Sequence, residues 1–190
     1  PVEILDDGTT SDANKRGAVG DLRWVVGEKG IDDDLLVVAG DNLFDLDLTR
    51  FVAFQKKKKT PIVALKDFKD RNLISQYSVV TLDTSGKITN FDEKPAFPKT
   101  TLISICLYLF PKDQLGLLEE YAKAGGKQDQ PGYYIQWLVK RTKTCGFTFD
   151  GLWFDIGDID SYNKANTVFE KRVMEHGAES KPRPERKKQP

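Results

Sequence analysis

Two acidic residues follow short apolar runs that are typical of buried strands. Asp41 belongs to Gly-Asp-Asn at 40–42, directly after the apolar run at 35–39, and Asp155 belongs to Trp-Phe-Asp-Ile-Gly at 153–157. In open α/β sheets ligands bind beyond the carboxyl ends of the strands. Mg²⁺ is commonly held by one or two carboxylates together with phosphate oxygens of a substrate. We therefore predict that Asp41 and Asp155 face one cleft and bind a magnesium ion there.

Each acid also has a plainer interpretation. Gly-Asp-Asn at 40–42 has the composition of a turn, and its spacing alone favours a turn over a ligand site. An isolated acid before a helix, such as Asp155, is more often a capping or surface group. The metal site is therefore predicted from the two acids together and not from either one alone.

A third motif, Glu-Lys-Pro at 93–95, lies between the two acids in the sequence. It follows the second strand of a predicted β-hairpin. Glu93 offers a hydrogen-bond acceptor for hydroxyl groups, and Lys94 offers a cation for a phosphate group. On its own the tripeptide is better explained as a surface ion pair, so it adds to the site only beside the two acids.

The pattern of apolar residues predicts the elements that carry these motifs. A buried strand at 35–39, a helix at 48–55 and a strand at 62–65 form a βαβ unit, which is typical of an α/β sheet with mainly parallel strands and right-handed crossovers. Runs at 79–82 and 87–91 predict a β-hairpin inserted in that sheet. The other expected elements are helices at 18–26, 114–124, 134–141 and 161–175 and strands at 101–110, 145–149 and 152–154.

Composition narrows the class of protein. A chain of 190 residues fits one domain of ordinary size or most of a larger one. Its 39% hydrophobic content and its balance of 29 basic and 29 acidic residues argue against a disordered protein and against nucleic-acid binding by bulk charge. No apolar run reaches the roughly 20 residues of a membrane-spanning helix, so we predict a cytoplasmic protein with no membrane partner.

The two cysteines and the single histidine carry no recognisable chemistry. Cys106 and Cys145 lie in or beside strand-like segments and lack metal-ligand spacing, so we interpret both as reduced packing residues. His176 lies at the end of the last predicted helix, where a surface role is the default. The polar, proline-rich segment 177–190 that follows is predicted to be a disordered basic tail.

Four motifs, taken in order, resemble the sugar nucleotidyltransferase family. They are Gly-Ala-Val-Gly-Asp at 17–21, Leu-Val-Val-Ala-Gly-Asp-Asn-Leu-Phe at 36–44, Glu-Lys-Pro at 93–95, and 153–157 with Tyr162 and Ala165. The likeness is closest to the glucose-1-phosphate thymidylyltransferase type. It implies a Rossmann-like α/β fold with a mixed, mainly parallel sheet flanked by helices. It also implies Mg²⁺-dependent transfer of a nucleotidyl group from a nucleoside triphosphate to a sugar 1-phosphate, giving an NDP-sugar and pyrophosphate.

The resemblance assigns roles to matching residues. Asp41 and Asp155 would coordinate the Mg²⁺ and, with Lys94, form the catalytic set. Glu93 would bind sugar hydroxyls, Lys94 would contact the sugar phosphate, and Asn42 would join the substrate-binding residues. The backbone at Gly17 would approach the nucleotide base. The implied partners are a nucleoside triphosphate and a sugar 1-phosphate, and a homo-oligomer stays open.

The chain also departs from the family pattern. The family opens with a strand and a glycine-rich loop carrying Arg and a downstream Pro-Lys, and nothing in residues 1–190 matches it. We therefore expect a catalytic domain at 1–176 that is incomplete at its N-terminus and inactive on its own. Ser78 follows Tyr77 where the family usually has Gly, and Ile105-Cys106 stands where it often has Thr-Gly.

Two other functions stay open at this stage. Asp-Leu-Asp at 45–47 is a DxD motif, which in a metal-dependent glycosyltransferase could hold a sugar-nucleotide diphosphate through Mn²⁺. A non-catalytic regulatory homologue is the other alternative, and the unmatched glycine-rich loop is its best support. The position of DxD just after Gly-Asp-Asn, with Glu-Lys-Pro and Asp-Ile-Gly elsewhere, favours the nucleotidyltransferase.

Overall fold

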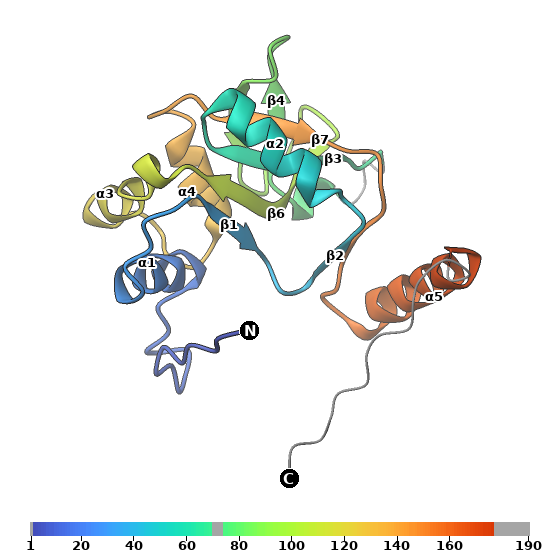
Figure 1. The fold of residues 1–190 in the computed structure, drawn as a ribbon, viewed down its shortest axis with the longest axis horizontal. Coiled ribbons are helices and arrows are strands. Elements are labelled where there is room, and N and C mark those ends of the chain that lie inside the picture. Colours follow the sequence, from blue (N-terminus) through green and yellow to red (C-terminus); the bar gives the residue numbers. More distant parts are fainter. Residues whose placement is uncertain (1, 70–73, 177–190) are drawn as a thin grey trace.

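The computed structural model describes residues 2–69 and 74–176 (Figure 1). The predicted tail at 177–190 lies outside the described residues. The α-helices are α1 (Ala18–Glu28), α2 (Leu48–Lys58), α3 (Leu117–Lys123), α4 (Pro131–Leu138) and α5 (Ile159–His176), with short 3₁₀ turns at Ile74–Gln76 and Lys112–Gln114. The strands are β1 (Leu35–Val38), β2 (Asn42–Phe44), β3 (Ile62–Asp67), β4 (Val79–Leu82), β5 (Ile88–Asp92), β6 (Leu102–Phe110), β7 (Cys145–Thr148) and β8 (Trp153–Asp155).

The strands form two sheets. The larger runs in the order β5-β4-β6-β3-β7, with β1 added to β6, and the smaller pairs β2 with β8. The α/β class with a β4–β5 hairpin is confirmed, but the prediction of a mainly parallel sheet is wrong. Among the described residues only β3 and β7 pair in parallel, while β6 is antiparallel to β1, β3 and β4.

The error has a physical cause in β6. Leu109 of β6 pairs with Leu36 of β1 on one edge and with Ile62 of β3 on the other. The two strands of the predicted βαβ unit therefore do run in the same direction, but β6 lies between them and runs the opposite way. A continuous apolar pattern shows that a strand is buried on both faces, and it carries no information about the direction of its neighbours.

Helices cover both faces of the larger sheet (Figure 1). One cluster of buried side chains joins the sheet to α2, and another joins it to α1, α3 and α4. β3 shows the division, because Ile62 and Ala64 belong to the α2 cluster whereas Val63 and Leu65 belong to the other. This alternation is the period of two that a strand dictates. The core therefore consists of two layers separated by one sheet.

Helix α2 is fixed at both ends by its own sequence. The Asp47 carboxylate accepts hydrogen bonds from the backbone N–H groups of Thr49 and Arg50, which makes it an N-cap. The last turn carries lysines and ends at Lys59 in a left-handed conformation with φ of 53°, as expected for a solvated basic C-terminus.

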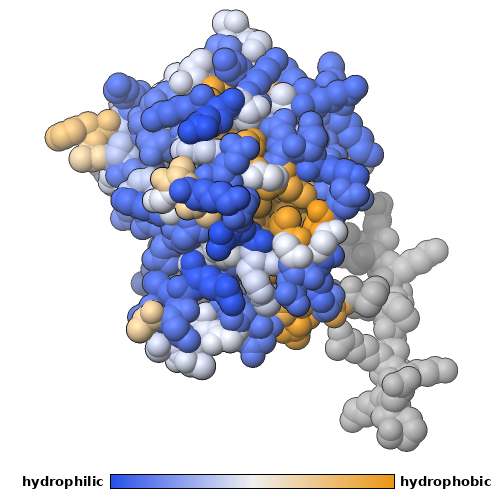
Figure 2. All heavy atoms as spheres, turned by 90° about the vertical axis from the view of Figure 1, so that its left-hand side faces the viewer, coloured by the Kyte–Doolittle hydropathy of each residue, from blue (hydrophilic) through white to orange (hydrophobic). Residues whose placement is uncertain are grey.

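The face seen in Figure 2 is mostly hydrophilic, with hydrophobic residues gathered in a hollow near its middle. Within the described residues no helix is long and apolar enough to cross a bilayer.

Candidate functional site

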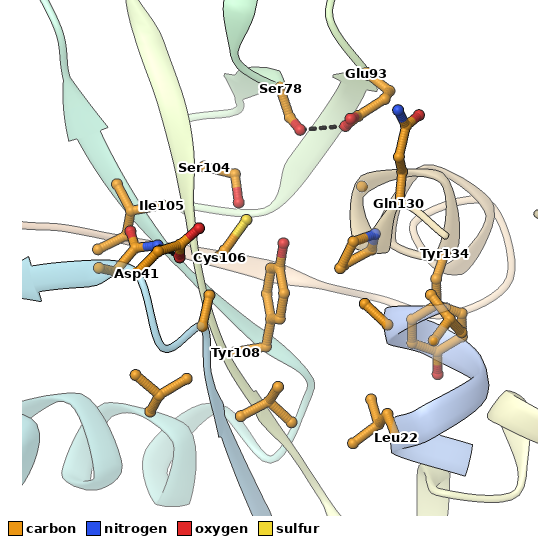
Figure 3. A pocket seen from close by; sticks show the side chains of 18 of the residues that line it. Leu22, Asp41, Ser78, Glu93, Ser104, Ile105, Cys106, Tyr108, Gln130 and Tyr134 are labelled. Atoms are coloured by element: carbon orange, nitrogen blue, oxygen red, sulfur yellow. Dashed lines mark hydrogen bonds between the residues drawn. The ribbon is translucent and has the colours of Figure 1, made fainter. Parts of the chain in front are cut away.

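A cavity of about 730 Å³ lies where β1, β6, the end of the β4–β5 hairpin, α1 and α4 meet (Figure 3). Five of the predicted site residues line it: Asp41, Asn42, Glu93, Lys94 and Asp155. These residues come from three distant parts of the sequence. The structure therefore brings together the acids and the Glu-Lys pair, as the sequence analysis expected of their positions.

The small sheet brings the two acids together. Asp41 lies in the turn between β1 and β2, and the next residue, Asn42, pairs with Asp155 of β8. The backbone N–H of Ile156 donates to the Asp41 carbonyl at 2.9 Å, which locks the two segments side by side. The turn interpretation of Gly-Asp-Asn is therefore right for the backbone, and the same turn places Asp41 at the cavity. We call Asp41 and Asp155 the acidic end of the cavity.

The electrostatics of the acidic end suit a cation. Burial raises the pKa of the Asp155 carboxyl above its ordinary value, and the nearby charge of Asp41 raises it further, while Lys94 acts in the opposite direction. Two carboxylates that repel each other in a partly buried place are stabilised when a positive charge lies between them. Asp41 is also oriented, because its Oδ1 accepts a hydrogen bond from Asn42 Nδ2 at 2.8 Å.

The donor set fits Mg²⁺ in one particular way. No group of three or more His, Cys, Asp or Glu side chains that could hold a metal occurs within the part of the chain that the structure describes. Two carboxylates alone supply too few ligands to complete the coordination of a metal ion. They do match the usual Mg²⁺ arrangement, in which one or two carboxylates share the ion with waters and with phosphate oxygens of a substrate. The role of both acids as metal ligands stays a prediction.

Glu93 is held in place from two sides. Ser78 Oγ donates a hydrogen bond to Glu93 Oε2 (Figure 3). A Cβ atom at Gly132 of α4 would lie 1.6 Å from the same oxygen, so the helix backbone approaches the carboxylate as closely as a glycine allows. This leaves Oε1 as the oxygen available to a ligand. Lys94 follows in a left-handed conformation with φ of 44°, and neither residue makes a salt bridge within the described residues.

Gly17 does not line this cavity. It precedes α1 with φ of 76°, and a Cβ there would lie 2.7 Å from the backbone of Gln128. The need for glycine at this position is therefore explained by close packing. Gly17 instead borders a neighbouring hollow together with Asp21, which also reaches the main cavity. The expected approach of Gly17 to a nucleotide base stays a prediction.

Sequence reasoning missed a row of side chains on β6. Ser104, Cys106 and Tyr108 line the cavity between the acidic end and α4, and we call them the β6 wall (Figure 3). Ser104 is 4% and Tyr108 2% exposed, yet Ser104 Oγ and Tyr108 OH find no hydrogen-bond partner among the described residues. Buried hydroxyls are nearly always paired, so orphaned ones indicate a place where water or a ligand binds. Their spacing of two residues within a strand was the available signal.

Aromatic rings add an apolar surface beside the acidic end. The rings of Tyr77 and Trp153, which both line the cavity, pack edge to face with centroids 5.4 Å apart. Trp153 Nε1 donates to Asn42 Oδ1 at 2.5 Å, so the ring and the turn that carries Asp41 hold each other in place. The motif at 153–157 therefore contributes both a carboxylate and an aromatic face.

The two acids of the DxD motif at 45–47 have structural roles in the fold. Asp45 forms a salt bridge with Arg172 of α5, and Asp47 caps α2. Neither lines the cavity. The glycosyltransferase alternative therefore loses the residues on which it depended.

Comparison with known proteins settles the family. The family model described as "Nucleotidyl transferase" matches residues 2–172. The chain belongs to the nucleotidyl transferase family. The resemblance to sugar nucleotidyltransferases is thereby confirmed at the level of the family.

Individual relatives of this nucleotidyl transferase chain are more distant. It is 27% identical over 139 residues to a glucose-1-phosphate adenylyltransferase of Thermomicrobium roseum, a match that covers 70% of this chain and 32% of the relative. It is 32% identical over 137 residues to a UTP–glucose-1-phosphate uridylyltransferase of Synechocystis sp., covering 70% of this chain and 34% of that protein. The chain thus matches about a third of the length of these relatives.

Solved structures share the fold. A structure assigned as a glucose-1-phosphate thymidylyltransferase of Bacillus anthracis aligns with a TM-score of 0.67 at 22% identity, covering 82% of this chain and 62% of that one. A UDP-glucose pyrophosphorylase complexed with UDP-glucose aligns with a TM-score of 0.69 at 20% identity, covering 83% and 63%. The nucleotidyl transferase fold is therefore present, although the sheet described here is mostly antiparallel.

Proposed function

We propose that this chain forms the sugar-phosphate and metal side of an enzyme that transfers a nucleotidyl group from a nucleoside triphosphate to glucose 1-phosphate. The observation that carries the proposal is the meeting of Asp41 and Asp155 at one cavity with Glu93 and Lys94. The two relatives described above both have glucose 1-phosphate in their names, which supports this sugar phosphate.

The reaction asks little covalent chemistry of the protein. A phosphate oxygen of the sugar 1-phosphate forms a bond to the α-phosphorus, and the bond from that phosphorus to the bridging oxygen breaks. Pyrophosphate leaves with the electron pair. No side-chain nucleophile is needed, so catalysis consists of alignment and neutralisation of charge. A bound Mg²⁺ would supply Lewis acidity at the phosphate oxygens and would be held by Asp41 and Asp155.

The other residues would hold the sugar phosphate. Lys94 would neutralise its phosphate, and the effect of its charge on Asp155 supports a position of this cation close to the proposed metal ligands. Glu93 Oε1 would accept one sugar hydroxyl, since Ser78 and α4 enclose the other oxygen. The rings of Tyr77 and Trp153 would cover an apolar face of the sugar.

Calorimetric titration of glucose 1-phosphate into the 190-residue chain, with and without Mg²⁺, tests the proposal. We expect binding that Mg²⁺ strengthens and that Asp41→Asn weakens. Asp150→Asn, a change at an exposed acid away from the cavity, is the matched control. Equal affinity in Asp41→Asn and the unchanged chain would contradict the proposal. The expected lack of turnover by residues 1–190 stays a prediction.

A further inference from the structure

Cys106 has an unusual backbone conformation for its place in the fold. It lies in the middle of β6 with φ of 52°, a left-handed value that side-chain-bearing residues rarely adopt. The register between β3 and β6 shifts at this point, because Val63 pairs with Tyr108 but Leu65 already pairs with Ser104. β6 therefore bulges around Cys106. Such outliers persist where the surrounding structure imposes them, and they are frequent at ligand sites.

The thiol of Cys106 lines the cavity. In Figure 3 the sulfur atom of Cys106 lies between the side chains of Ser104 and Tyr108, with Asp41 to one side. Burial raises the pKa of the thiol above its ordinary value, and the nearby Tyr108 side chain acts in the opposite direction. The negative charges of Glu93, Asp41 and Asp155 raise the pKa further. Cys106 therefore presents a neutral, compact and weakly polar group at the centre of the site.

The two flanking hydroxyls support a ligand site at this point of the cavity. Ser104 Oγ and Tyr108 OH are buried and line the cavity, and neither makes a hydrogen bond of regular geometry among the described residues. Tyr108 lies near enough to Ser104 and Cys106 for both to act on the pKa of its hydroxyl. Leaving such groups unpaired is costly, so a polar molecule that reaches both is favoured. In Figure 3 the sulfur atom lies between these two side chains, so a molecule that contacts both hydroxyls would pass close to the thiol.

We propose that Cys106 determines which sugar the cavity accepts, with the ring of a hexose 1-phosphate lying against its thiol between the Ser104 and Tyr108 hydroxyls. This inference rests on the proposed function and adds its sugar selectivity. The thiol occupies space that a glycine would leave to the ligand. We therefore expect a hexose 1-phosphate without a bulky substituent to bind more tightly than an N-acetylhexosamine 1-phosphate, whose acetamido group needs more room.

Thiol labelling tests the position of the sugar without any variant. Cys106 is partly exposed whereas Cys145 is fully buried, so N-ethylmaleimide adds to Cys106 in the native chain and Cys145 serves as the internal control. With Mg²⁺ and glucose 1-phosphate at about ten times its measured Kd, we expect labelling of Cys106 to slow about tenfold, because only the free chain reacts. Inorganic phosphate at the same concentration should give little protection.

The outcomes separate this inference from the proposed function. Glucose 1-phosphate that binds by calorimetry but leaves Cys106 labelling unchanged would overturn the inference alone. A chain that binds no glucose 1-phosphate would overturn both. Protection by inorganic phosphate equal to that by the sugar phosphate would also overturn it, because the phosphate and not the sugar ring would then cover the thiol.

Selectivity is tested with Cys106→Gly and Cys106→Ser. In Cys106→Gly the ratio of affinities for N-acetylglucosamine 1-phosphate and glucose 1-phosphate should rise about tenfold, the scale on which a pocket distinguishes one small group. Cys106→Ser keeps a side chain of nearly the same size, so its ratio should stay close to that of the unchanged chain. An unchanged ratio in Cys106→Gly, with the far-UV circular dichroism spectrum retained, would show that another residue sets the selectivity.

Discussion

The acidic end and the β6 wall line the same cavity and are built by opposite means. The acidic end carries charges on a two-stranded sheet with three residues in each strand, and Asp41 and Asp155 repel each other there. The β6 wall carries neutral groups on a nine-residue strand that pairs with three others. Carboxylate groups are the ligands that a cation such as Mg²⁺ prefers, whereas neutral hydroxyl groups can exchange hydrogen bonds with a sugar. The difference indicates which end binds which part of the substrate.

The largest effect is expected at Gly132, where the backbone of α4 packs closely against the Glu93 carboxylate. In Gly132→Ala the added Cβ would lie 1.6 Å from Glu93 Oε2. We expect the free energy of unfolding, measured by urea denaturation, to fall by about 1–3 kcal/mol, because the Glu93 carboxylate must leave its place beside Ser78 and α4.

Gly27→Ala is the matched control for that change. Gly27 also lies in a helix, α1, but a Cβ there would meet no atom within 4 Å. This substitution should raise the free energy of unfolding by about 0.5–1 kcal/mol. Similar losses in both variants would mean that Gly132 has no special contact with Glu93.

Lys94 tests the charged side of the comparison. Lys94→Ala should weaken glucose 1-phosphate binding in calorimetry by about 1–3 kcal/mol, or roughly ten- to a hundredfold, the scale of a charge-assisted hydrogen bond. Lys94→Arg should not restore it fully, since a planar fork replaces a compact cation. The exposed Lys99→Ala is the control. An equal loss of affinity for glucose 1-phosphate in Lys99→Ala would mean that the effect of Lys94→Ala comes from the change in net charge and not from a specific contact.

Asp155 predicts a pH dependence that the β6 wall lacks. The folded-state pKa of Asp155 is raised, so ionisation favours the unfolded chain as pH rises through that pKa, and the stabilising contribution is complete only below the ordinary value of 3.8. Asp155→Asn should therefore raise Tm at neutral pH without metal. The difference should disappear as the medium is acidified below the ordinary value.

The same variant should lose the rise in Tm that Mg²⁺ and glucose 1-phosphate give the unchanged chain. Differential scanning calorimetry at several pH values measures both effects. Asp150→Asn, at an exposed acid, should show neither. A Tm for Asp155→Asn below that of the unchanged chain at neutral pH would contradict the repulsion between the two acids.

The smallest effect is expected at Tyr108 and concerns the β6 wall alone. Tyr108→Phe removes a buried hydroxyl that has no partner among the described residues, so Tm should stay equal or rise. Affinity for glucose 1-phosphate should nevertheless fall about fivefold, close to the net value of one hydrogen bond. A fall in Tm with unchanged affinity would instead mean that the Tyr108 hydroxyl stabilises the fold and does not contact the ligand.

The sequence predicted correctly that Asp41 and Asp155 lie at one cavity, but the strands that bring them there are arranged differently from the prediction. The motifs at 40–42 and 153–157 were expected at the ends of strands in a mainly parallel sheet. Asn42 and Asp155 instead pair within a separate antiparallel sheet. The residues could be chosen because polar groups after apolar runs mark strand ends in either arrangement. Their partners could not, because pairing is decided by contacts distant in the sequence.

The sequence analysis did not assign the β6 wall or the Ser78–Glu93–Gly132 contact to the site, for two physical reasons. The segment 101–110 is almost entirely apolar, so its pattern favours burial on both faces and hides Ser104 and Tyr108 in the core. The contact joins residues from two strand ends and a helix, and no local pattern reports on such packing. Ser78 was noted only as a departure from the family, without a partner.

Hydrogen exchange should expose an order of assembly in the cavity. Amides of β6 are held by strands on both edges, whereas the β2–β8 ladder is a short two-stranded ribbon of a kind that is marginal alone. We expect β6 to exchange slowest and the β2–β8 ladder to become protected only when metal and sugar phosphate are present. The β6 wall would then be folded before the substrate binds, whereas the acidic end would become ordered only when metal and sugar phosphate bind.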